Sequence, residues 1–404
     1  MPTAALSYTP RFKEYDLGRS HPMRPSRVLR TYDLIRACGL LEPPSVSLHE
    51  PSQADEDTLA LIHSPDYIAA VRAPAEGRSF SRPFRFGLGT VDTPITEGLY
   101  EAAALIVGAS VQAADLVADG QASVAFNPAG GLHHAHRARA AGFCVFNDAA
   151  IAIAHLLRRT GDGVRIAYLD IDAHHGDGVQ EAFYSRRDVL TISLHESGRY
   201  LYPSTGEVEE IGDGEGEGFS VNLPLSPYTN DYSYLWAFRE AIIPMLEAFQ
   251  PDFVVTQLGV DTHYSDPLTH MCLTTQGYLS VVQEIASRFP RWIALGGGGY
   301  NVETVPRAWT LAFAAMAGME PPERIPKSQA RRYRSLVPAP CPGQPEGAGE
   351  QNEADAPEQL PCLHDTAVPV VDEDWARVAR EFAEETVEAV KSRLFPYHGL
   401  SART

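Results

Sequence analysis

Short apolar, β-branched runs alternate with longer segments of helical periodicity from about residue 5 to residue 320. The clearest runs lie at 164–171, 189–194, 252–259 and 291–297. Each is nearly continuous in apolar residues, which is typical of strands covered on both faces. Alternation of such strands with helices predicts an α/β domain built on a parallel sheet.

The predicted helices begin and end at recognisable signals. Ser64 followed by Pro65 is typical of an N-cap and the first helical position. A second helix is predicted over 94–118, because the helical pattern stops at Gly120, and a third over 306–317. These helices supply the covering layers that a parallel sheet requires.

The chain changes character after residue 336. Six of the 24 residues from 338 to 361 are proline and three are glycine, and such a stretch buries too little apolar surface to offset its ordering entropy. We predict a main domain over 1–320, a Pro/Gly-rich linker or loop over 321–371, and a C-terminal helix within 372–404. This helix fits 373–394, with Asp372 as its cap. The apolar stripe expected to dock it on the main domain is Trp375, Val378, Phe382, Val387, Val390 and Leu394.

Composition and charge narrow the possible functions. With 44% hydrophobic and 21% charged residues, the chain has a globular composition. The 33 basic and 52 acidic residues give a net charge of −19, which repels phosphate backbones and anionic membrane surfaces. No apolar run approaches the roughly 18 residues of a membrane span, and the first twenty residues lack the apolar core of a secretory signal. We therefore predict neither nucleic-acid binding nor membrane binding.

The cysteine and lysine contents bear on the compartment and the source. Five scattered cysteines with no C-x-x-C pair argue against a disulfide framework and against a cysteine zinc site. All but three of the basic residues are arginine, which we interpret as codon bias that favours a bacterial source. A reducing, cytoplasmic location is predicted.

The densest group of polar side chains is DIDAHHGDG at 170–178, directly after a predicted strand. Ligands bind at the carboxyl ends of strands in open parallel sheets. Because side chains alternate along a strand, Asp170, Asp172 and His174 are expected to project to one side. Two carboxylates and an imidazole favour a divalent-metal site, and a solvated polar loop is the alternative.

Two further motifs follow predicted strands or turns. Asp261 comes shortly after the strand at 252–259, where it is either an ordinary N-cap or a third metal ligand. In GGLHHAHR (130–137), His133 and His134 are candidates for proton transfer because imidazole titrates near neutrality. Surface histidines or additional metal ligands are the alternatives for this pair.

The fourth motif is the glycine-rich segment LGGGGYN at 295–301. Its glycines let the backbone approach a ligand closely, and Tyr300 offers a hydroxyl donor. A dinucleotide-binding fingerprint is excluded, because Asn301 stands where the last glycine of that fingerprint is required.

In these motifs the sequence resembles the zinc-dependent histone deacetylases, in particular the bacterial acetoin-utilisation deacetylases. The resemblance covers about residues 1–320 and implies one three-layer α/β/α domain with a central eight-stranded parallel sheet, related to arginase. This single domain replaces the two or three domains that length alone suggests. The matching motifs, in the family's order, are HPMRPSR (21–27), HSPDYI (63–68), VDTPITEGLYEA (91–102), GGLHHA (130–135), GFCVFNDAAIA (142–152), YLDIDAHHGDGVQEAFY (168–184), TISLH (191–195), QLGVDTHYSDP (257–267) and LGGGGYN (295–301).

The resemblance implies two metal sites. Asp172, His174 and Asp261 match the ligands of the catalytic Zn²⁺, and three protein ligands leave a position open for water and substrate. Fe²⁺ or Mn²⁺ also suits ligands of this hardness. A structural K⁺ is implied at residues that match the family's potassium site: the side chains of Asp170 and Ser193 and the backbone carbonyls of Asp172, His174 and Leu194.

The catalytic roles also follow from the resemblance. We assign His134 as the general base that later protonates the leaving amine, and His133 as the residue that stabilises charge. Asp170 and Asp177 match the carboxylates that hydrogen-bond His133 and His134, respectively, and so fix their tautomers. Tyr300 matches the tyrosine that polarises the acyl carbonyl.

Phe143 and Tyr202 match the aromatic walls of the family's acyl-lysine tunnel. Asp92 lies at the rim, where the family binds substrate backbone amides, and Gly142 and the rim residue Leu268 complete the predicted substrate-binding set. Arg27 lies where the family lines its acetate exit. Tyr202 stands where many relatives have phenylalanine, so it adds a hydroxyl to the tunnel. Leu268 stands where polyamine deacetylases tend to carry an acidic gatekeeper, so acyl-lysine in a protein is favoured over acetylpolyamine.

The sequence therefore predicts metal-dependent hydrolysis of N-ε-acetyl-lysine, or another short acyl-lysine, in proteins, with release of acetate. An acetylpolyamine or other small amide is the alternative substrate. An arginase-like ureohydrolase would need more ligands for two manganese ions, and a non-catalytic acyl-lysine reader would lack a ligand or Tyr300. Because every site residue precedes Asn301, a chain cut near residue 320 is expected to keep its metal site. The oligomeric state is not predicted.

Overall fold

A single parallel sheet forms the centre of the protein. The computed structural model describes residues 3–74, 83–336 and 360–401, and within them eight strands pair in the order β2-β1-β3-β8-β7-β4-β5-β6. The predicted fold is confirmed. The strands are β1 (Ala4–Ser7), β2 (Val46–His49), β3 (Val124–Asn127), β4 (Ile166–Asp170), β5 (Val189–Glu196), β6 (Ser220–Leu225), β7 (Phe253–Gln257) and β8 (Trp292–Leu295).

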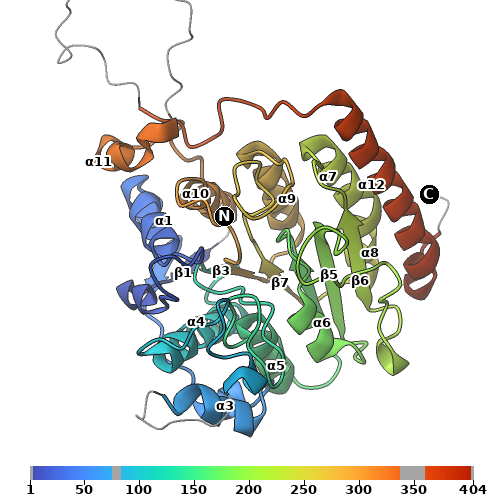
Figure 1. The fold of residues 1–404 in the computed structure, drawn as a ribbon, viewed down its shortest axis with the longest axis horizontal. Coiled ribbons are helices and arrows are strands. Elements are labelled where there is room, and N and C mark those ends of the chain that lie inside the picture. Colours follow the sequence, from blue (N-terminus) through green and yellow to red (C-terminus); the bar gives the residue numbers. More distant parts are fainter. Residues whose placement is uncertain (1–2, 75–82, 337–359, 402–404) are drawn as a thin grey trace, which may run out of the picture.

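Helices cover both faces of this sheet (Figure 1). One layer contains α1 (Ser26–Ala37), α7 (Asp231–Ala237), α8 (Ile243–Phe249), α9 (Thr275–Arg288), α10 (Thr304–Met316) and α12 (Glu373–Leu394). The opposite layer contains α4 (Leu99–Ala118), α5 (Asp148–Thr160) and α6 (Asp177–Phe183). The remaining short helices are α2 (Glu56–Leu59), α3 (Pro65–Arg72) and α11 (Lys327–Ala330).

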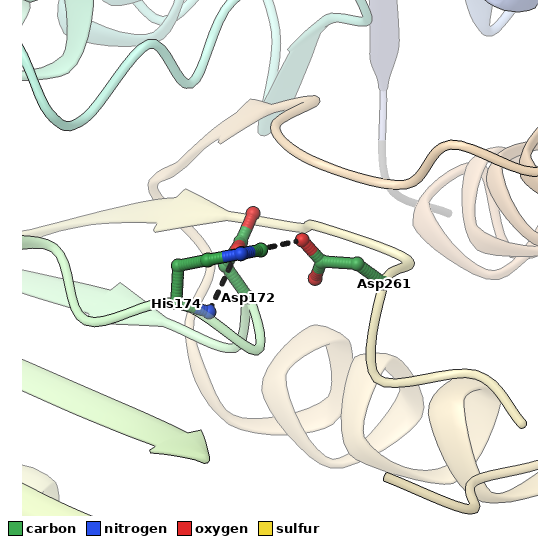
Figure 2. Close-up of side chains that lie close together, drawn as sticks. All are labelled: Asp172, His174 and Asp261. Atoms are coloured by element: carbon green, nitrogen blue, oxygen red, sulfur yellow. Dashed lines mark hydrogen bonds and ion pairs between the residues drawn. The ribbon is translucent and has the colours of Figure 1, made fainter. Parts of the chain in front are cut away.

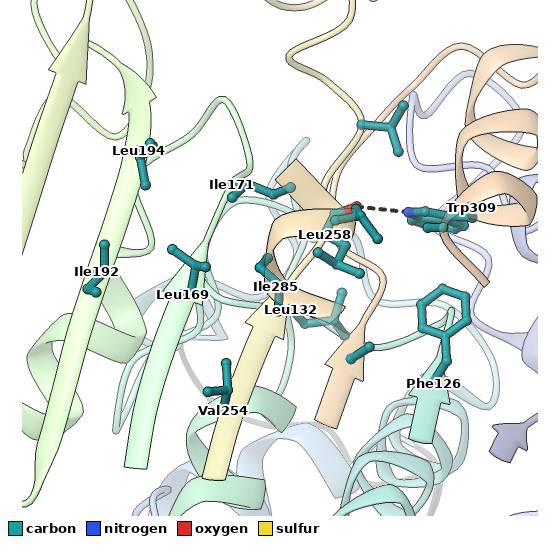
Figure 3. Packing of buried hydrophobic residues seen from close by; sticks show 14 of the residues in the cluster. Phe126, Leu132, Leu169, Ile171, Ile192, Leu194, Val254, Leu258, Ile285 and Trp309 are labelled. Atoms are coloured by element: carbon teal, nitrogen blue, oxygen red, sulfur yellow. Dashed lines mark hydrogen bonds between the residues drawn. The ribbon is translucent and has the colours of Figure 1, made fainter. Parts of the chain in front are cut away.

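The continuous apolar runs arise because each central strand is buried on both faces. In β4, Leu169 points into a cluster that includes Trp309 of α10, which Figure 3 shows in close-up. Its neighbour Tyr168 points into a second cluster that includes Ile153 of α5. The Trp309 indole N–H donates to the carbonyl of Leu258 at 2.8 Å, so the only polar atom of this ring is satisfied.

The element boundaries agree with the sequence to within a few residues. Ser64 caps α3, and its Oγ accepts a hydrogen bond from the backbone N–H of Tyr67 at 3.3 Å. α4 begins at Leu99, five residues after the predicted start, because Gly98 adopts a left-handed conformation with φ of 73° that helical residues do not have. α10 begins at Thr304, two residues before the predicted start.

α4 corrects the statement that no apolar run approaches the length of a membrane span. By length and composition alone this 20-residue helix could cross a membrane, and it is the one such helix among the described residues. In the structure, 67% of its most apolar window is buried, where it packs against α5, β1 and β3. Its apolar character is that of a core helix.

The segment expected as a linker over 321–371 is structured at both ends. Ile325, Tyr333 and Leu363 are fully buried and pack together against α1 and α10. The backbone N–H of Ile325 donates to the carbonyl of Pro361 at 2.8 Å, so residues on either side of the Pro-rich stretch contact each other. The Pro-rich stretch itself, 337–359, lies outside the described residues.

The C-terminal helix α12 has the predicted bounds and the predicted cap, since Oδ1 of Asp372 accepts from the N–H of Asp374 at 2.9 Å. It packs on β6 and α7. Its apolar stripe is most deeply buried in its second half, where Val387, Val390 and Leu394 are fully buried. Trp375 and Val378 in the first half are 54% and 40% exposed, although the Trp375 ring lies 5.3 Å from the ring of Tyr228 on the main domain, so the stripe docks unevenly.

Because the side chains of α12 are buried to different extents, replacing them with alanine should lower the free energy of unfolding by different amounts. Leu394→Ala removes a fully buried side chain, and we expect the free energy of unfolding to fall by about 2–5 kcal/mol. Val378→Ala, on the same helix but partly exposed, should cost less than about 1 kcal/mol. Urea unfolding of both variants measures the difference. Equal losses would contradict this account of the docking.

Candidate active site and metal centre

The four motifs meet because their strands are neighbours. β3, β8, β7 and β4 lie side by side in that order. Their last residues are in register, since Asn127 pairs with Leu295, Leu295 with Gln257, and Gln257 with Asp170. The histidine pair, the glycine segment, Asp261 and the DIDAHHGDG motif therefore all leave the sheet at one level. Segments up to 170 residues apart in the chain form one site at its carboxyl edge.

Asp172, His174 and Asp261 form a buried cluster at this edge (Figure 2). Nδ1 of His174 lies 3.0 Å from Oδ1 of Asp172 and 2.9 Å from Oδ2 of Asp261. One donor atom from each residue lies within 4.8 Å of the others. Of the two interpretations open for Asp261, the structure supports the third metal ligand.

The remaining carboxylate oxygens are held by protein N–H groups. Oδ2 of Asp172 accepts from the side chain of Gln257 at 2.6 Å and from the backbone of Gly298 at 2.8 Å. Oδ1 of Asp261 accepts from the backbone of Ala173 at 2.8 Å. One oxygen of each carboxylate is thus left to converge with the imidazole, and this donor set fits a divalent cation.

The charges of the cluster also fit a cation. Burial and the neighbouring Asp172 carboxylate raise the pKa of Asp261 to about 8. Burial opposes the charge of His174, but its two carboxylate partners raise its pKa well above the usual value. Two carboxylates this close in the interior repel each other, and positive charge between them relieves the repulsion. The chain therefore provides a metal-binding triad.

Asp170 lies beside the triad rather than in it: its Oδ1 accepts from the backbone N–H of Asp172 at 3.1 Å, and the His133 ring lies between the carboxylates of Asp170 and Asp172. β4 ends at Asp170, and the backbone N–H of Ile171 still donates to the carbonyl of Gln257 in β7 at 3.1 Å. Oδ2 of Asp170 lies 2.7 Å from Nδ1 of His133 and also accepts from the Tyr168 hydroxyl at 2.6 Å. Asp170 therefore supports the histidine pair.

The two histidines have matching carboxylate partners but opposite protonation preferences. Nδ1 of His134 lies 2.7 Å from Oδ1 of Asp177, and the two imidazole rings are 4.0 Å apart. Burial disfavours the charged form of His133, but Asp170 and Asp172 outweigh it and raise its pKa to about 9. Burial and the neighbouring His133 lower the pKa of His134 to about 4. Near neutral pH, His133 holds a proton and His134 can accept one.

Tyr300 lies near the triad, on the side of the His174 ring. Its ring meets Phe143 edge-on, with centroids 5.7 Å apart, and lies 6.4 Å from the His174 ring. Burial and the carboxylates of Asp261 and Asp172 raise its pKa well above the usual value. The hydroxyl therefore stays protonated and remains a hydrogen-bond donor.

One cavity of about 260 Å³ joins these groups. Its lining contains His134, His174 and Tyr300 together with all five residues predicted to bind substrate: Asp92, Gly142, Phe143, Tyr202 and Leu268. Tyr202 is 44% exposed, and its ring meets His134 edge-on at 5.1 Å. The cavity runs from the surface to the metal-binding triad.

Arg27 lies behind the site. Its Nη1 donates to the carbonyls of Gly297 and Gly299 at 2.6 and 3.1 Å. It also lines a separate small cavity of about 20 Å³, with Met23 and Leu132 among the other lining residues.

Some of the residues expected at the potassium site are neighbours in the structure. The β4–β5 register pairs Asp170 with Ser193, next to Leu194. Oγ of Ser193 lies 2.9 Å from Nδ1 of His195.

Several residues that shape the site were not assigned from the sequence. Besides Gln257 and Gly298, buried Asp148 accepts from the backbone of Gly131 and Leu132 at 2.9 and 2.7 Å and so holds the loop before the histidines. Asp266 accepts from the backbone N–H of Tyr300 at 2.7 Å. All four residues lie in motifs quoted for the family. Their presence in these motifs without an assigned role was the signal that the sequence offered.

Comparison with known proteins identifies the family. A model described as the histone deacetylase domain matches residues 21–316. This chain belongs to the histone deacetylase family. It is 41% identical over 349 residues to the acetoin utilization protein AcuC of Bacillus subtilis (strain 168), a match that covers 85% of this chain and 89% of that protein.

A plant relative and a solved structure support the same family assignment. The chain is 37% identical to histone deacetylase 2 of Oryza sativa subsp. japonica, over 81% of this chain and 64% of that protein. The crystal structure of an HDAC homologue complexed with SAHA has a TM-score of 0.81 and 31% identity, covering 96% of this chain and 100% of that chain. The chain is a deacetylase of this family, a hydrolase with a buried metal-binding triad.

In this deacetylase the closeness of Gly298 to the triad gives a test of the metal site. A Cβ at Gly298 would overlap Oδ2 of Asp261 and lie 2.6 Å from Oδ2 of Asp172. We expect Gly298→Ala to displace both carboxylates and to lower bound metal at least tenfold, as measured by elemental analysis of the purified protein.

Gly277→Ala is the matched control, because its new Cβ would overlap the half-buried carboxylate of Asp231, which is outside the triad. This variant should be destabilised but keep its metal. Full metal content in folded Gly298→Ala would contradict the assignment of the triad.

Proposed function

We propose that this deacetylase hydrolyses the amide of N-ε-acetyl-lysine, or of another short acyl-lysine, in proteins. The observation that carries the proposal is the cavity of about 260 Å³ that leads past Phe143 and Tyr202 to the triad. A lysine side chain is long and narrow, so it places its acyl group at the end of such a cavity while its peptide backbone stays at the rim. Asp92, at the rim, is suited to bind backbone N–H groups.

The chain's own residues supply the proton transfers. Because Nδ1 of His134 is bonded to Asp177, its Nε2 is free to accept a proton from the attacking water and to donate it to the leaving amine. His133, protonated beside Asp170, contributes positive charge next to the reacting centre. The Tyr300 hydroxyl donates to the acyl oxygen as negative charge develops there.

The triad would hold Zn²⁺, as the family does, and Fe²⁺ or Mn²⁺ also suits two carboxylates and one imidazole. A cation bound there polarises the acyl carbonyl and makes a bound water more acidic. We also propose a structural K⁺ at Asp170, Ser193 and the carbonyls of Asp172, His174 and Leu194. The β4–β5 register that sets Asp170 beside Ser193 supports it.

The favoured substrate is a protein rather than a polyamine. Leu268 lines the cavity and has no charge to bind a second ammonium group. Its backbone N–H donates to Oδ1 of Asp266 at 2.9 Å, which fixes this apolar residue at the wall. We also propose a cytoplasmic protein that binds neither nucleic acid nor membranes, on the basis of its net charge of −19 and its cysteine usage.

Turnover on defined substrates tests the proposal. Metal-replete protein should release acetate from an acetyl-lysine peptide, and should act on acetylspermidine at least tenfold less efficiently by kcat/KM. Hydroxamates, which chelate metal through two oxygens, should inhibit it. The proposal fails if a panel of acyl-lysine peptides gives no turnover with protein whose metal content is measured in the same sample.

Tyr300 distinguishes an enzyme from a protein that only binds acyl-lysine. Tyr300→Phe removes one hydroxyl and keeps the ring against Phe143. We expect a loss on the order of 3 kcal/mol of transition-state stabilisation, which is a hundredfold or more in kcat. Affinity for the acetyl-lysine peptide should fall much less, because a neutral carbonyl gains little from this donor.

The measurements for Tyr300→Phe are single-turnover rates and peptide affinity, made on both proteins at equal metal content. Wild-type turnover by the variant would remove Tyr300 from the mechanism.

A further inference from the structure

The C-terminal segment delivers a buried carboxylate to the back of the active site. Asp365 lies beyond the residues 21–316 that match the family model, and its side chain is 4% exposed. Oδ1 accepts from Nη2 of Arg307 at 2.9 Å. Oδ2 accepts from Nε2 of His263 and from the backbone N–H of Thr275, each at 2.8 Å. One carboxylate thus joins α9, α10 and the loop after β7.

The contact with His263 leads to the catalytic loops. Nδ1 of His263 accepts from the backbone N–H of Ser265 at 3.1 Å, so the ring proton lies on Nε2 and points at Asp365. Oγ of Ser265 lies 2.9 Å from Nδ2 of Asn301 and 3.0 Å from Oγ1 of Thr304. Asn301 directly follows Tyr300 in the chain.

A second bond joins the same two loops. Asp266 accepts from the backbone N–H of Tyr300 at 2.7 Å. The loop that begins at Asp261 therefore holds the segment 300–301 at two points, and its own far side is held by Asp365. The described residues form a continuous series of hydrogen bonds from Asp365 through His263 and Ser265 to Asn301.

The burial of this network makes its geometry costly to change. The side chains of His263 and Arg307 are 3% and 2% exposed. Without the carboxylate, the guanidinium of Arg307 would be buried without an anionic partner, which is strongly unfavourable. The histidine would keep a buried N–H donor without an acceptor. Both groups would have to move, and His263 would carry the loop with it.

We propose that Asp365 is a positioning residue that holds the Tyr300 hydroxyl in register with the acyl-lysine cavity. The inference rests on the function proposed for Tyr300. Asp365 itself touches neither the cavity nor the triad, so it acts through His263 and the loop that contains Ser265 and Asp266. The segment that follows the Pro-rich stretch is then part of the catalytic apparatus.

The matched variants are Asp365→Asn and Leu363→Ala. Asp365→Asn keeps the shape of the side chain but removes its charge and one acceptor oxygen. Leu363 is fully buried two residues earlier, and its side chain packs with Leu34 and Leu311. Leu363→Ala removes these apolar contacts but keeps both the Asp365 carboxylate and the Leu363 carbonyl, which accepts from Nη1 of Arg307 at 3.0 Å. We expect kcat of Asp365→Asn to fall about tenfold to a hundredfold, with KM and metal content within twofold of wild type. Leu363→Ala should keep kcat within about twofold.

A double variant shows whether the effect passes through Tyr300. In a Tyr300→Phe background, Asp365→Asn should lower kcat by less than twofold, because the hydroxyl that it positions is already absent. The proposal is overturned if Asp365→Asn keeps wild-type kcat, if Leu363→Ala loses as much, or if the full loss persists in the Tyr300→Phe background.

Hydrogen exchange gives a readout that needs no turnover. The amide of Tyr300 is bonded to Asp266, so loosening the loop should speed exchange in the peptide that contains residues 299–302. We expect faster exchange in Asp365→Asn, and exchange at the wild-type rate in Leu363→Ala. If wild-type protein hydrolyses no acyl-lysine, the proposed function fails, while this comparison still decides the positioning role. Unchanged exchange in Asp365→Asn would overturn it.

Discussion

Two carboxylates, Asp172 and Asp261, converge on one imidazole in the interior of the protein, and the rest of the site is arranged around that constraint. Like charges repel strongly where water is excluded, so each oxygen needs a donor or a cation. Gln257 and the backbone of Gly298 hold one side of Asp172. A Cβ at Gly259 or Gly298 would overlap a carboxylate of the pair. Glycines at these positions are therefore a steric consequence of the two buried charges.

Much of the fold and of the site could be predicted because the signals are local. A strand buried on both faces leaves an apolar run, and polar residues at its carboxyl end mark a ligand site. What the sequence does not contain is the order of the strands. Asp261 could be an N-cap or a ligand until β7 was found beside β4. Side-chain alternation grouped Asp170 with Asp172, and only the family resemblance separated their roles; in the structure Asp170 bonds His133, whose ring also lies 4.0 Å from Asp172.

Amino-acid composition was least informative about segments whose placement depends on the structure that surrounds them. The 20 residues of α4 fit a membrane span by length and composition, yet the helix is mostly buried against the sheet and α5. Asp365 follows a Pro-rich stretch and has no periodic pattern around it, but its partners come from residues 263, 275 and 307. Contacts between such distant segments leave no trace in a window of sequence. For the same reason, a domain boundary drawn at residue 320 separates a buried arginine from its carboxylate.

The histidine pair shows how the buried charges also set the chemistry. His133 lies against Asp170 and within 4.0 Å of Asp172, so it keeps its proton despite burial. That positive charge, 4.0 Å away between ring centroids, adds to burial in keeping His134 neutral. The carboxylates of Asp170 and Asp172 thereby give two similar imidazoles different roles: one is a cation and the other is a base. Two adjacent histidines in a motif can be recognised as a pair from sequence, but which of them accepts the proton is decided by the carboxylates that the fold places beside each ring.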